Sequence, residues 1–465
     1  MHFRQFYLGC LAHASYLIGS EAEAAVIDPQ RDVQIYLDEA QQHGFVIRHV
    51  IETHCHADFI SGHRELAART GAKVYFGAKA SPKFEFVGVR EDDEIRFGAV
   101  TLRFLETPGH TPESMSILVF DCEKSSSTPE AVLTGDTMFI GDVGRPDLLG
   151  SRMAPEELAG MLYDSLHHKL LKLPDQVKVF PAHGAGSMCG RNISSETSST
   201  IGDQRKFNYA LQPMKREDFV KMMTTDLPEA PSYFGMDAQI NLEGPNLLQE
   251  LPQPKPLFPA EVQRRQKEGH LVLDTRTASQ YGAGHVPNSL NVCLSGQFAS
   301  WAGIVIRPDV PLIIVAEDEA HVREAQIRLA RVGLEKVAGY LVGGIFVWNQ
   351  SKLPLAATEQ ISVEELNHRL DEKSVDHLLD VRRKPEWNAG HIAKADRHPL
   401  NHLAETADRL PRDARIAVIC AGGFRSSIGT SILERMGFQK ITNVVGGMTA
   451  WNNAKLPSAS ETLSR

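Results

Sequence analysis

Short apolar runs alternate with polar turns and amphipathic segments through the first half of the chain. Residues 16–18 and 24–27 predict two strands, and apolar positions at helical spacing predict a helix between Val33 and Gly44. Later apolar runs predict four strands that end near residues 51, 106, 133 and 179. Such alternation is typical of α/β folds in which helices cover the outer faces of sheets.

Each of these four strands is followed at once by residues that can bind a metal. They are His54, His56 and Asp58 after the first strand, then His110, Asp136 and His183. The carboxyl end of a strand is the usual place for chemistry in α/β folds. Crowded His and Asp side chains are costly unless a metal or a charged partner satisfies them. The pattern therefore predicts a metal site, and the alternative of incidental histidines in polar loops is the weaker one.

The order of these residues resembles the metallo-β-lactamase superfamily over about residues 1–240. In its binuclear hydrolases, such as glyoxalase II, the first loop reads His-x-His-x-Asp-His. The resemblance implies that the last Asp and His of that loop hold a second metal, together with the His that matches His183. Here Phe59 replaces the final His of the loop. Phenylalanine cannot bind a metal, so we expect one metal ion.

Within the superfamily the pattern is most similar to the persulfide dioxygenases. The resemblance implies one Fe(II) ion per chain, held by three residues: His54, His110 and Asp136. Two His and one carboxylate on one face leave positions open for O₂ and substrate, as in non-haem Fe(II) oxygenases. Three further residues are expected to orient ligands and waters: His56, Asp58 and His183. His56 as a fourth ligand is the alternative.

Arg145 lies in a glycine-rich stretch next to the expected ligand Asp136. Persulfide dioxygenases have an Arg at a similar place, in a Gly-Arg-x-Asp setting. The resemblance implies that Arg145 attracts an anionic persulfide or the carboxylates of its carrier thiol. The alternative is a structural pair with Asp142 or Asp147, and the sequence favours neither.

Length, charge and cysteine content limit the classes of protein. The 465 residues exceed what one core holds, so about two to four domains are expected. The formal net charge of −9 argues against nucleic-acid binding. No apolar run approaches the roughly 18 residues of a membrane helix, and the first residues lack a signal peptide pattern. Six scattered cysteines predict free thiols in a reducing cytoplasm.

The second half of the chain contains an internal repeat. Residues 251–259 include four prolines and predict a stiff linker. After it, Leu-Asp-x-Arg, Gly-His and Gly-Gly signatures each occur twice, at an offset of 106 residues at the start and 103 at the end. The repeated elements resemble two rhodanese domains, which implies parallel sheets with helices on both faces.

The predicted fold class is therefore multidomain α/β. Four segments are expected: a metallo-β-lactamase αββα sandwich at residues 1–245, a Pro-rich linker at 246–259, a rhodanese domain lacking the Cys at 260–354, and an active rhodanese domain at 360–459.

The second copy keeps the residues of a sulfur-transfer loop. Cys420 follows an apolar strand and begins Cys-Ala-Gly-Gly-Phe-Arg-Ser-Ser, which resembles the rhodanese loop Cys-x-x-x-x-Arg. Backbone N–H groups around Gly422 and Gly423, and the following helix N-terminus, favour the thiolate and the anionic Cys-S-S⁻. Arg425 can guide an anionic sulfur donor. The alternative, an inert buried Cys, does not explain the residues arrayed after it.

The first copy has lost these groups. Ala316 stands in place of the Cys, His321 stands in place of the Arg, and acidic residues lie between them. We expect no sulfurtransferase activity there, and a role as spacer, docking surface or dimer contact.

Together the resemblances imply a persulfide dioxygenase fused to a sulfurtransferase, acting in sulfide detoxification. The expected partners are O₂, sulfite or thiosulfate, and the persulfide of a small thiol such as glutathione or coenzyme A. We expect a homo-oligomer with no nucleic acid and no membrane. One alternative is a Zn²⁺-dependent glyoxalase II-like thioesterase or hydrolase with a rhodanese accessory module. Another is a rhodanese pair that only binds or regulates.

Overall fold

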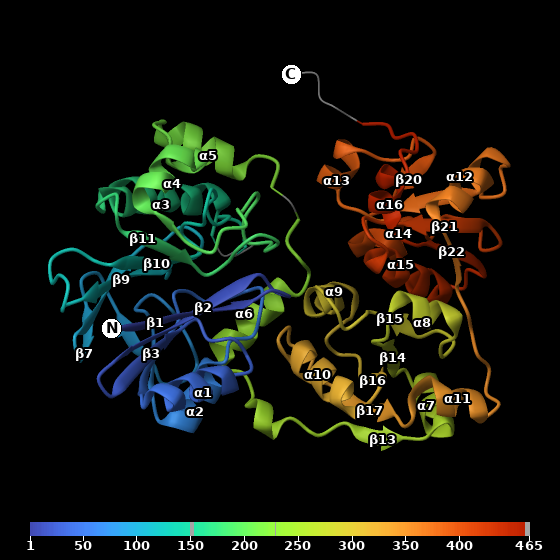
Figure 1. Ribbon diagram of the computed structural model, residues 1–465, viewed down its shortest axis with the longest axis horizontal. Coiled ribbons are helices and arrows are strands. Elements are labelled where there is room, and N and C mark those ends of the chain that lie inside the picture. Colours follow the sequence, from blue (N-terminus) through green and yellow to red (C-terminus); the bar gives the residue numbers. More distant parts are fainter. Residues whose placement is uncertain (149–152, 228, 461–465) are drawn as a thin grey trace. The chain divides into compact units, whose positions relative to one another are not determined.

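The computed structural model describes residues 1–148, 153–227 and 229–460 (Figure 1). The chain divides into two compact units, residues 1–251 with 327–334 and residues 252–326 with 335–465. Within the described ranges, no helix has both the length and the apolar character of a membrane span.

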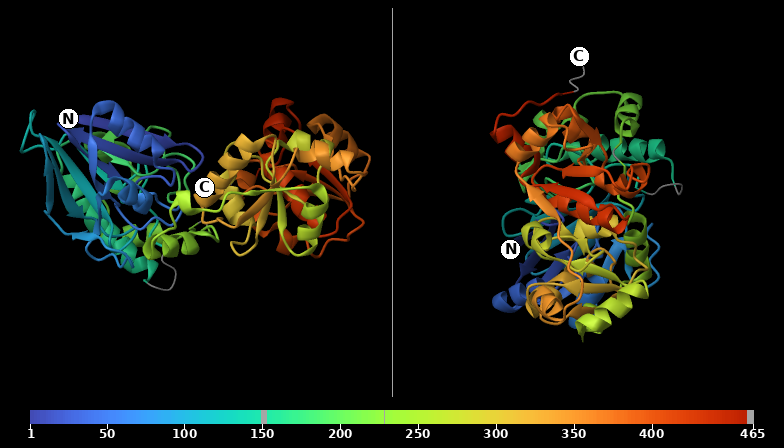
Figure 2. Two further views of the ribbon diagram at one scale, coloured as in Figure 1. Left: turned by 90° about the horizontal axis from the view of Figure 1, so that it is seen from below. Right: turned by 90° about the vertical axis from the view of Figure 1, so that its right-hand side faces the viewer.

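Two six-stranded sheets form the centre of the first unit (Figures 1 and 2). The first sheet has the order β1 (His2–Leu8), β2 (His13–Ser20), β3 (Glu23–Ile27), β4 (Val46–Ile51), β5 (Lys73–Gly77) and β6 (Val87–Val89). The second has the order β12 (Ser199–Thr200), β11 (Lys178–Pro181), β10 (Ala131–Gly135), β9 (Met115–Asp121), β8 (Val100–Glu106) and β7 (Glu94–Phe97). Strands β3 to β6 run parallel, as do β10 and β11, and the other pairs are antiparallel.

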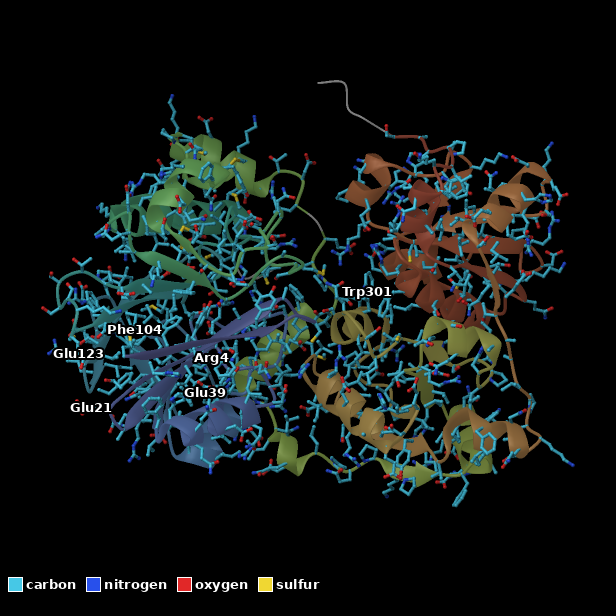
Figure 3. The ribbon with its side chains drawn as sticks, viewed as in Figure 1. Arg4, Glu21, Glu39, Phe104, Glu123 and Trp301 are labelled. Carbon is cyan, nitrogen blue, oxygen red and sulfur yellow. The ribbon has the colours of Figure 1, made fainter. Side chains whose placement is uncertain are left out.

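The inner faces of the two sheets enclose an apolar core. Ile18, Ile27 and Ile51 of the first sheet pack in one cluster with Phe104 and Leu133 of the second. Phe104 is labelled in Figure 3. The outer faces are covered by α1 (Gln34–His43) and α2 (His63–Thr70) on one side, and by α3 (Pro155–His168), α4 (Ile201–Phe207) and α5 (Arg216–Thr224) on the other. Alternate residues of each strand point to opposite faces, so each sheet can pack on the other sheet and on helices at once. The resulting αββα sandwich confirms the predicted fold class.

The strands end where the apolar runs predicted. The strand β4 ends at Ile51, β8 at Glu106, β10 at Gly135 and β11 at Pro181. Helix α2 ends before Gly71, whose φ of 72° lies in the left-handed region that favours glycine at a helix terminus. Each predicted metal-binding residue consequently lies in a loop or first turn directly after a strand.

Residues 184–245 contain several helical segments. Helix α5 includes Phe219. The chain also forms α4 and α6 (Phe234–Glu243), with a short 3-10 helix at Tyr209–Leu211. A signal for α4 was present, because the side chain of Thr200 caps the helix by accepting from the backbone N–H of Asp203.

The second unit contains two five-stranded parallel sheets with the same strand order (Figure 1). One sheet has the order β13 (Lys255–Leu257), β17 (Val337–Leu341), β16 (Leu312–Val315), β14 (Leu271–Asp274) and β15 (Leu290–Asn291). The other has the order β18 (Glu359–Ile361), β22 (Lys440–Val444), β21 (Arg415–Ile419), β19 (His377–Asp380) and β20 (Ala395–Arg397). The matching order reflects the internal repeat.

Helices lie beside both of these sheets. The first copy has α7 (Pro259–Lys267), α8 (Ala278–Ala283), α9 (Phe298–Val305), α10 (Glu319–Ala330) and α11 (Gly344–Gln350). The second copy has α12 (Val363–Asp371), α13 (Lys384–Ala389), α14 (Leu403–Thr406), α15 (Phe424–Arg435) and α16 (Gly447–Asn453). Part of the expected linker is not a free connector, because β13 pairs with β17 at the sheet edge.

The repeated sequence signatures are structural braces. Arg276 donates to both carboxylate oxygens of Asp274, and Arg382 does the same to Asp380. The glycine turns before α11 and α16 also match. A Cβ on Gly447 would lie 2.3 Å from the carbonyl oxygen of Cys420, and one on Gly344 would lie 3.1 Å from that of Ala316. Both glycines have positive φ, so each turn requires a residue without a Cβ.

Candidate metal centre and sulfur-transfer loop

Three of the residues expected to bind metal converge beside the ends of β4, β8 and β10. One ligand atom from each of His54, His110 and Asp136 lies within 4.8 Å of the other two, and all three residues are buried. His54 Nε2 lies 3.8 Å from Asp136 Oδ2. His110 Nε2 lies 3.5 Å from the same oxygen. The three side chains thus form one compact group of two imidazoles and one carboxylate.

The hydrogen bonds of the two histidines fix which ring nitrogen faces this group. His110 Nδ1 lies 2.9 Å from the carbonyl oxygen of Arg145, so Nδ1 must donate. His54 Nδ1 lies 3.0 Å from Thr53 Oγ1, which itself donates to Asp28 and therefore accepts from His54. Both Nε2 atoms keep a lone pair, which is the arrangement of metal-bound histidines held by an outer partner.

The inner atoms of the group fit a metal ion. His54 Nε2 and Asp136 Oδ2 are buried and have no hydrogen-bond partner among the described residues. Leaving such atoms unpaired costs about 1–3 kcal/mol each, and a bound cation would satisfy both. Two imidazole nitrogens and a carboxylate oxygen suit a divalent transition metal.

The protonation states also suit metal binding. Burial and the nearby His56 lower the pKa of His54 well below its ordinary value, so its ring is neutral. Burial alone would raise the pKa of Asp136, but His183 and His54 hold it well below its ordinary value. A neutral imidazole and an ionised carboxylate are the forms that bind metals.

His56 lies in a second buried cluster beside the metal group. Its Nε2 is 3.1 Å from Asp28 Oδ1 and 3.3 Å from Glu52 Oε2. Burial alone would lower the pKa of His56, but Asp28 and Glu52 raise it well above its ordinary value. Asp28 was not among the predicted site residues. Its carboxylate accepts from the backbone N–H and the hydroxyl of Thr53 and so fixes the start of the loop.

His183 bridges two carboxylates. Its Nδ1 lies 2.8 Å from Asp136 Oδ1, and its Nε2 lies 2.8 Å from Asp58 Oδ2. Burial alone would lower the pKa of His183, but the two carboxylates raise it to about 10. The ring is therefore an imidazolium that holds Asp136 in place, consistent with the orienting role predicted for His183 and Asp58.

Cys189 is a neighbour that the sequence did not indicate. One ligand atom each of Asp58, His183 and Cys189 lie within 4.8 Å of one another, and all are buried. Burial, Asp58 and Asp136 raise the pKa of the Cys189 thiol well above its ordinary value. The sequence around Cys189 shows no predicted strand followed by a glycine-rich turn, so nothing marked it as a candidate site residue.

Phe59 fills the place next to Asp58 with an apolar ring. It is 0% exposed, and its ring centroid lies 4.2 Å from that of His13 and 4.5 Å from that of His56. His13 was also missed, although it is buried and neither ring nitrogen has a hydrogen-bond partner among the described residues.

Helix α6 fastens the loop that carries His54 and Phe59. Asn241 donates through Nδ2 to the carbonyl oxygens of His56 and Phe59, at 2.8 Å each. Its Oδ1 accepts from the backbone N–H of Ser61 at 2.9 Å. The contact of Asn241 could not be predicted from the sequence, because α6 was not predicted and Asn241 lies 185 residues from His56.

Arg145 is paired, as one of its two predicted alternatives required. Its Nε and Nη2 donate to the two carboxylate oxygens of Asp147, at 2.7 Å each, and the side chain is 2% exposed. The carboxylate of Asp142 instead accepts from the hydroxyl of Tyr209 and from three backbone N–H groups. Arg145 serves the metal group through its carbonyl oxygen, which orients His110.

The sulfur-transfer loop lies between β21 and α15. Cys420 is 1% exposed, and its Sγ accepts from the backbone N–H of Gly423 at 3.1 Å. Gly423 has a φ of 98°, which turns that N–H toward the sulfur. Ser426 Oγ lies 3.5 Å from the same sulfur. Gly422 belongs to the turn, but no hydrogen bond joins it to Cys420 in the described contacts.

Arg425 has a carboxylate partner that the sequence did not indicate. Its Nη1 and Nη2 donate to Glu386 Oε2 and Oε1 at 2.7 and 2.6 Å. In the first copy, His321 pairs instead with Asp318 at 2.8 Å, and Ala316 offers no thiol. The two copies thus differ chemically at the loop that was predicted to differ.

Family models match both halves of the chain. The metallo-beta-lactamase superfamily matches residues 8–183, and the rhodanese-like domain matches residues 258–351 and 362–454. The human (Homo sapiens) mitochondrial persulfide dioxygenase ETHE1 is 29% identical over 227 residues, 47% of this chain and 79% of that protein. A hydroxyacylglutathione hydrolase of Polaromonas sp. (strain JS666) is 29% identical over 246 residues, 47% of this chain and 88% of that protein.

A solved structure extends the likeness over most of the chain. The crystal structure of a metallo-beta-lactamase from Staphylococcus aureus is 32% identical with a TM-score of 0.66, and the match covers 73% of this chain and 98% of that one. The chain belongs to the metallo-β-lactamase superfamily, has persulfide dioxygenases among its relatives, and continues into two rhodanese-like domains.

Proposed function

We propose that the chain is a non-haem Fe(II) persulfide dioxygenase that oxidises the persulfide of a small thiol to sulfite, coupled to sulfur transfer at Cys420. One Fe(II) ion would be held by His54, His110 and Asp136. The carrier thiol would be glutathione, coenzyme A or a similar molecule, and thiosulfate would be made or used at Cys420. Such a pair of activities suits sulfide detoxification, and a reducing cytoplasm would keep the six cysteines as thiols.

One observation carries the proposal for the first domain. Two imidazole nitrogens and one carboxylate oxygen lie within 4.8 Å of one another, and Phe59 replaces the loop histidine that the resemblance assigns to a second metal. The likeness to persulfide dioxygenases supports the same conclusion. When bound, Fe(II) in such a three-residue set supplies open positions for O₂ and substrate.

The residues of the chain prepare this site in defined ways. Thr53 and the Arg145 carbonyl oxygen hold His54 and His110 as Nδ1–H tautomers. The His183 imidazolium donates to Asp136 Oδ1, which leaves Oδ2 to face the two histidines. The ligands are therefore oriented before a substrate arrives.

At the second site, Cys420 would carry a sulfane sulfur. Its thiolate attacks the outer sulfur of a persulfide R-S-SH, the S–S bond breaks, and R-S⁻ leaves while Cys420-S-SH forms. Sulfite can then attack the outer sulfur, which yields thiosulfate and restores the Cys420 thiolate. The N–H of Gly423 stabilises the negative sulfur at each stage. Two sites in one chain raise the local concentration of shared intermediates.

Oxygen uptake tests the first activity. Iron-loaded protein should consume O₂ when glutathione persulfide is added, and His110→Ala should reduce this rate by about 100-fold because a ligand is lost. An oxygen electrode measures the rate, and elemental analysis gives the iron content. The exposed His368→Ala serves as the matched control and should behave as the unaltered protein. Iron-loaded protein that takes up no O₂ would refute the proposal.

The second activity is tested at Cys420. The Cys420→Ser variant should lose thiosulfate sulfurtransferase activity to background, because serine cannot carry a sulfane sulfur, and should keep oxygen uptake. Cys122→Ser, at an exposed cysteine, is the control and should keep both activities. Full transfer by Cys420→Ser would instead favour a rhodanese pair that only binds or regulates.

A second candidate function is a zinc-dependent hydrolase related to glyoxalase II. The hydroxyacylglutathione hydrolase relative favours it. Elemental analysis of purified protein, together with assays of thioester hydrolysis and O₂ uptake, separates the two. Two zinc ions per chain with hydrolysis and no O₂ uptake would support the hydrolase.

A further inference from the structure

The first rhodanese copy contacts the helix that begins at the sulfur-transfer loop. Ser427, in the first turn of α15, donates to Asn291 Oδ1 at 2.5 Å, and the backbone N–H of Asn291 donates to Ser431 Oγ at 3.1 Å. Near the end of the same helix, Glu434 accepts from the backbone N–H of Asn288 at 2.8 Å. Helix α15 is therefore held along its length by the copy that has no reactive cysteine.

The positive charge nearest the sulfur-transfer loop is neutralised. Glu386 binds Arg425 through both carboxylate oxygens and also accepts from the backbone N–H of Arg383 at 3.2 Å. Burial alone would raise the pKa of Glu386, but Arg425 holds it below its ordinary value, so the carboxylate is ionised. A donor with two negative charges meets a neutral pair here instead of a free guanidinium.

Trp301 of the first copy lies against this pair. It belongs to α9, is 5% exposed and is labelled in Figure 3. Its ring centroid lies 5.9 Å from the guanidinium carbon of Arg425 and 5.7 Å from that of Arg383. An indole at this range attracts a guanidinium and restricts its movement. The first copy thus packs against Arg425 through the indole ring of Trp301.

We propose that Glu386 and Trp301 are positioning residues that select the sulfur donor of Cys420. They hold Arg425 as part of a neutral pair, so the loop accepts the outer sulfur of an organic thiol persulfide in preference to thiosulfate. This inference rests on the proposed sulfur transfer at Cys420. Under this proposal the first copy contributes a side chain to the active site of the second, which goes beyond the roles expected from the sequence.

The physical reason is the charge that each donor brings. Thiosulfate is a small dianion, and to pair with Arg425 it must displace the carboxylate of Glu386 from a bidentate ion pair. A persulfide presents one ionisable sulfur, which the N–H of Gly423 can stabilise as the bond to the carrier breaks. In both cases the Cys420 thiolate attacks, one S–S bond breaks, and the leaving group departs as a thiolate or as sulfite.

Single-turnover loading of Cys420 tests the inference. Full-length protein is mixed without oxygen with thiosulfate or with glutathione persulfide, and mass spectrometry follows the gain of one sulfur on the Cys420 peptide. The unaltered protein should load from the persulfide with a second-order rate constant at least about tenfold larger. Glu386→Gln keeps the shape and removes the charge, and should shrink this ratio about tenfold by speeding thiosulfate loading.

Two further variants separate positioning from folding. Trp301→Ala should slow persulfide loading about threefold, the magnitude of one cation–π contact, and Trp301→Phe should restore most of it. Glu365→Gln removes a carboxylate from another arginine pair of the same domain and should leave the ratio unchanged.

The outcomes distinguish this inference from the proposed function. Loading from neither donor by the unaltered protein would overturn the sulfur transfer and the inference with it. Loading that occurs with equal rates from both donors, or with a ratio that Glu386→Gln does not move, would overturn the donor selection alone. The comparison of donors on the unaltered protein keeps the inference testable if Glu386→Gln does not fold.

Discussion

Phe59 is the residue that most distinguishes this metal group from a two-metal site. Its ring is fully buried between His13 and His56, and it stands beside Asp58, which is held by His183. A ligand at position 59 would add an imidazole beside that pair, which Cys189 also adjoins. The single aromatic ring consequently accounts for the expectation of one metal ion.

Phe59→His should raise the metal content from about one to about two ions per chain, because an imidazole would join Asp58 and His183. The smaller polar ring in an apolar contact should also destabilise the fold by about 1–3 kcal/mol. Elemental analysis after dialysis gives the metal content, and urea unfolding gives the stability. Phe104→His, at another fully buried Phe, controls for a histidine that merely disturbs the core. An unchanged metal content in folded Phe59→His protein would contradict this account.

The order of chemical groups along the chain predicted the three central residues but not their supports. His54, His110 and Asp136 each follow a strand, so the alternation of apolar and polar positions placed them among six candidates, and the resemblance to persulfide dioxygenases selected these three. Asn241 and Glu386 act over long sequence separations, 185 residues to His56 and 39 to Arg425, and no local pattern encodes such contacts.

Arg145 is another residue whose contacts the sequence motif alone could not decide. Its motif allowed either substrate binding or a pair with an acid. The structure shows a pair with Asp147, and the substrate-binding role stays a prediction.

Helices α13 and α15 are joined by one ion pair. Glu386 lies in the first turn of α13, where it also satisfies the backbone N–H of Arg383, and Arg425 lies in the first turn of α15. The pair thus connects two helix N-termini beside the loop of Cys420. Its strength depends on the ionisation of Glu386.

The stability that this ion pair contributes should depend on pH. The folded protein lowers the pKa of Glu386, so the contribution is complete above the ordinary glutamate value of 4.5 and is lost as the pH falls through the lower, folded value. The unaltered protein should exceed Glu386→Gln in urea midpoint at pH 7, and the difference should shrink between about pH 5 and pH 3. A constant difference across that range would show that the charge is not responsible.

Regular elements were predicted best where an apolar pattern and a stop signal agree. The helix ending before Gly44 and the strand ending at Glu106 are confirmed. Helix α6 was missed because its residues show little separation of apolar and polar faces. The strand β13 was read as part of a linker, since its prolines hide a strand that tolerates them at a sheet edge.

The chain combines one sandwich with two copies of a parallel-sheet domain. The repeat was detectable because its signatures are braces, such as Asp274 with Arg276 and Asp380 with Arg382, that the fold needs in each copy. The domain limits predicted from the sequence stay predictions. Contacts between the copies, such as Asn291 with Ser427, join residues 136 positions apart and could not be read from the repeat.

The matching glycine turns show that the first rhodanese copy keeps a backbone feature of the second. Gly344 still approaches the carbonyl oxygen of Ala316 as Gly447 approaches that of Cys420, although nothing reactive stands at 316. The first copy therefore keeps the backbone turn of the second, although the cysteine and the arginine of the loop are both replaced. A cysteine returned to position 316 would still lack the arginine that His321 replaces, and it would precede the acidic Glu317 and Asp318 in the chain. Side-chain charge, and no longer architecture, would then separate the two loops.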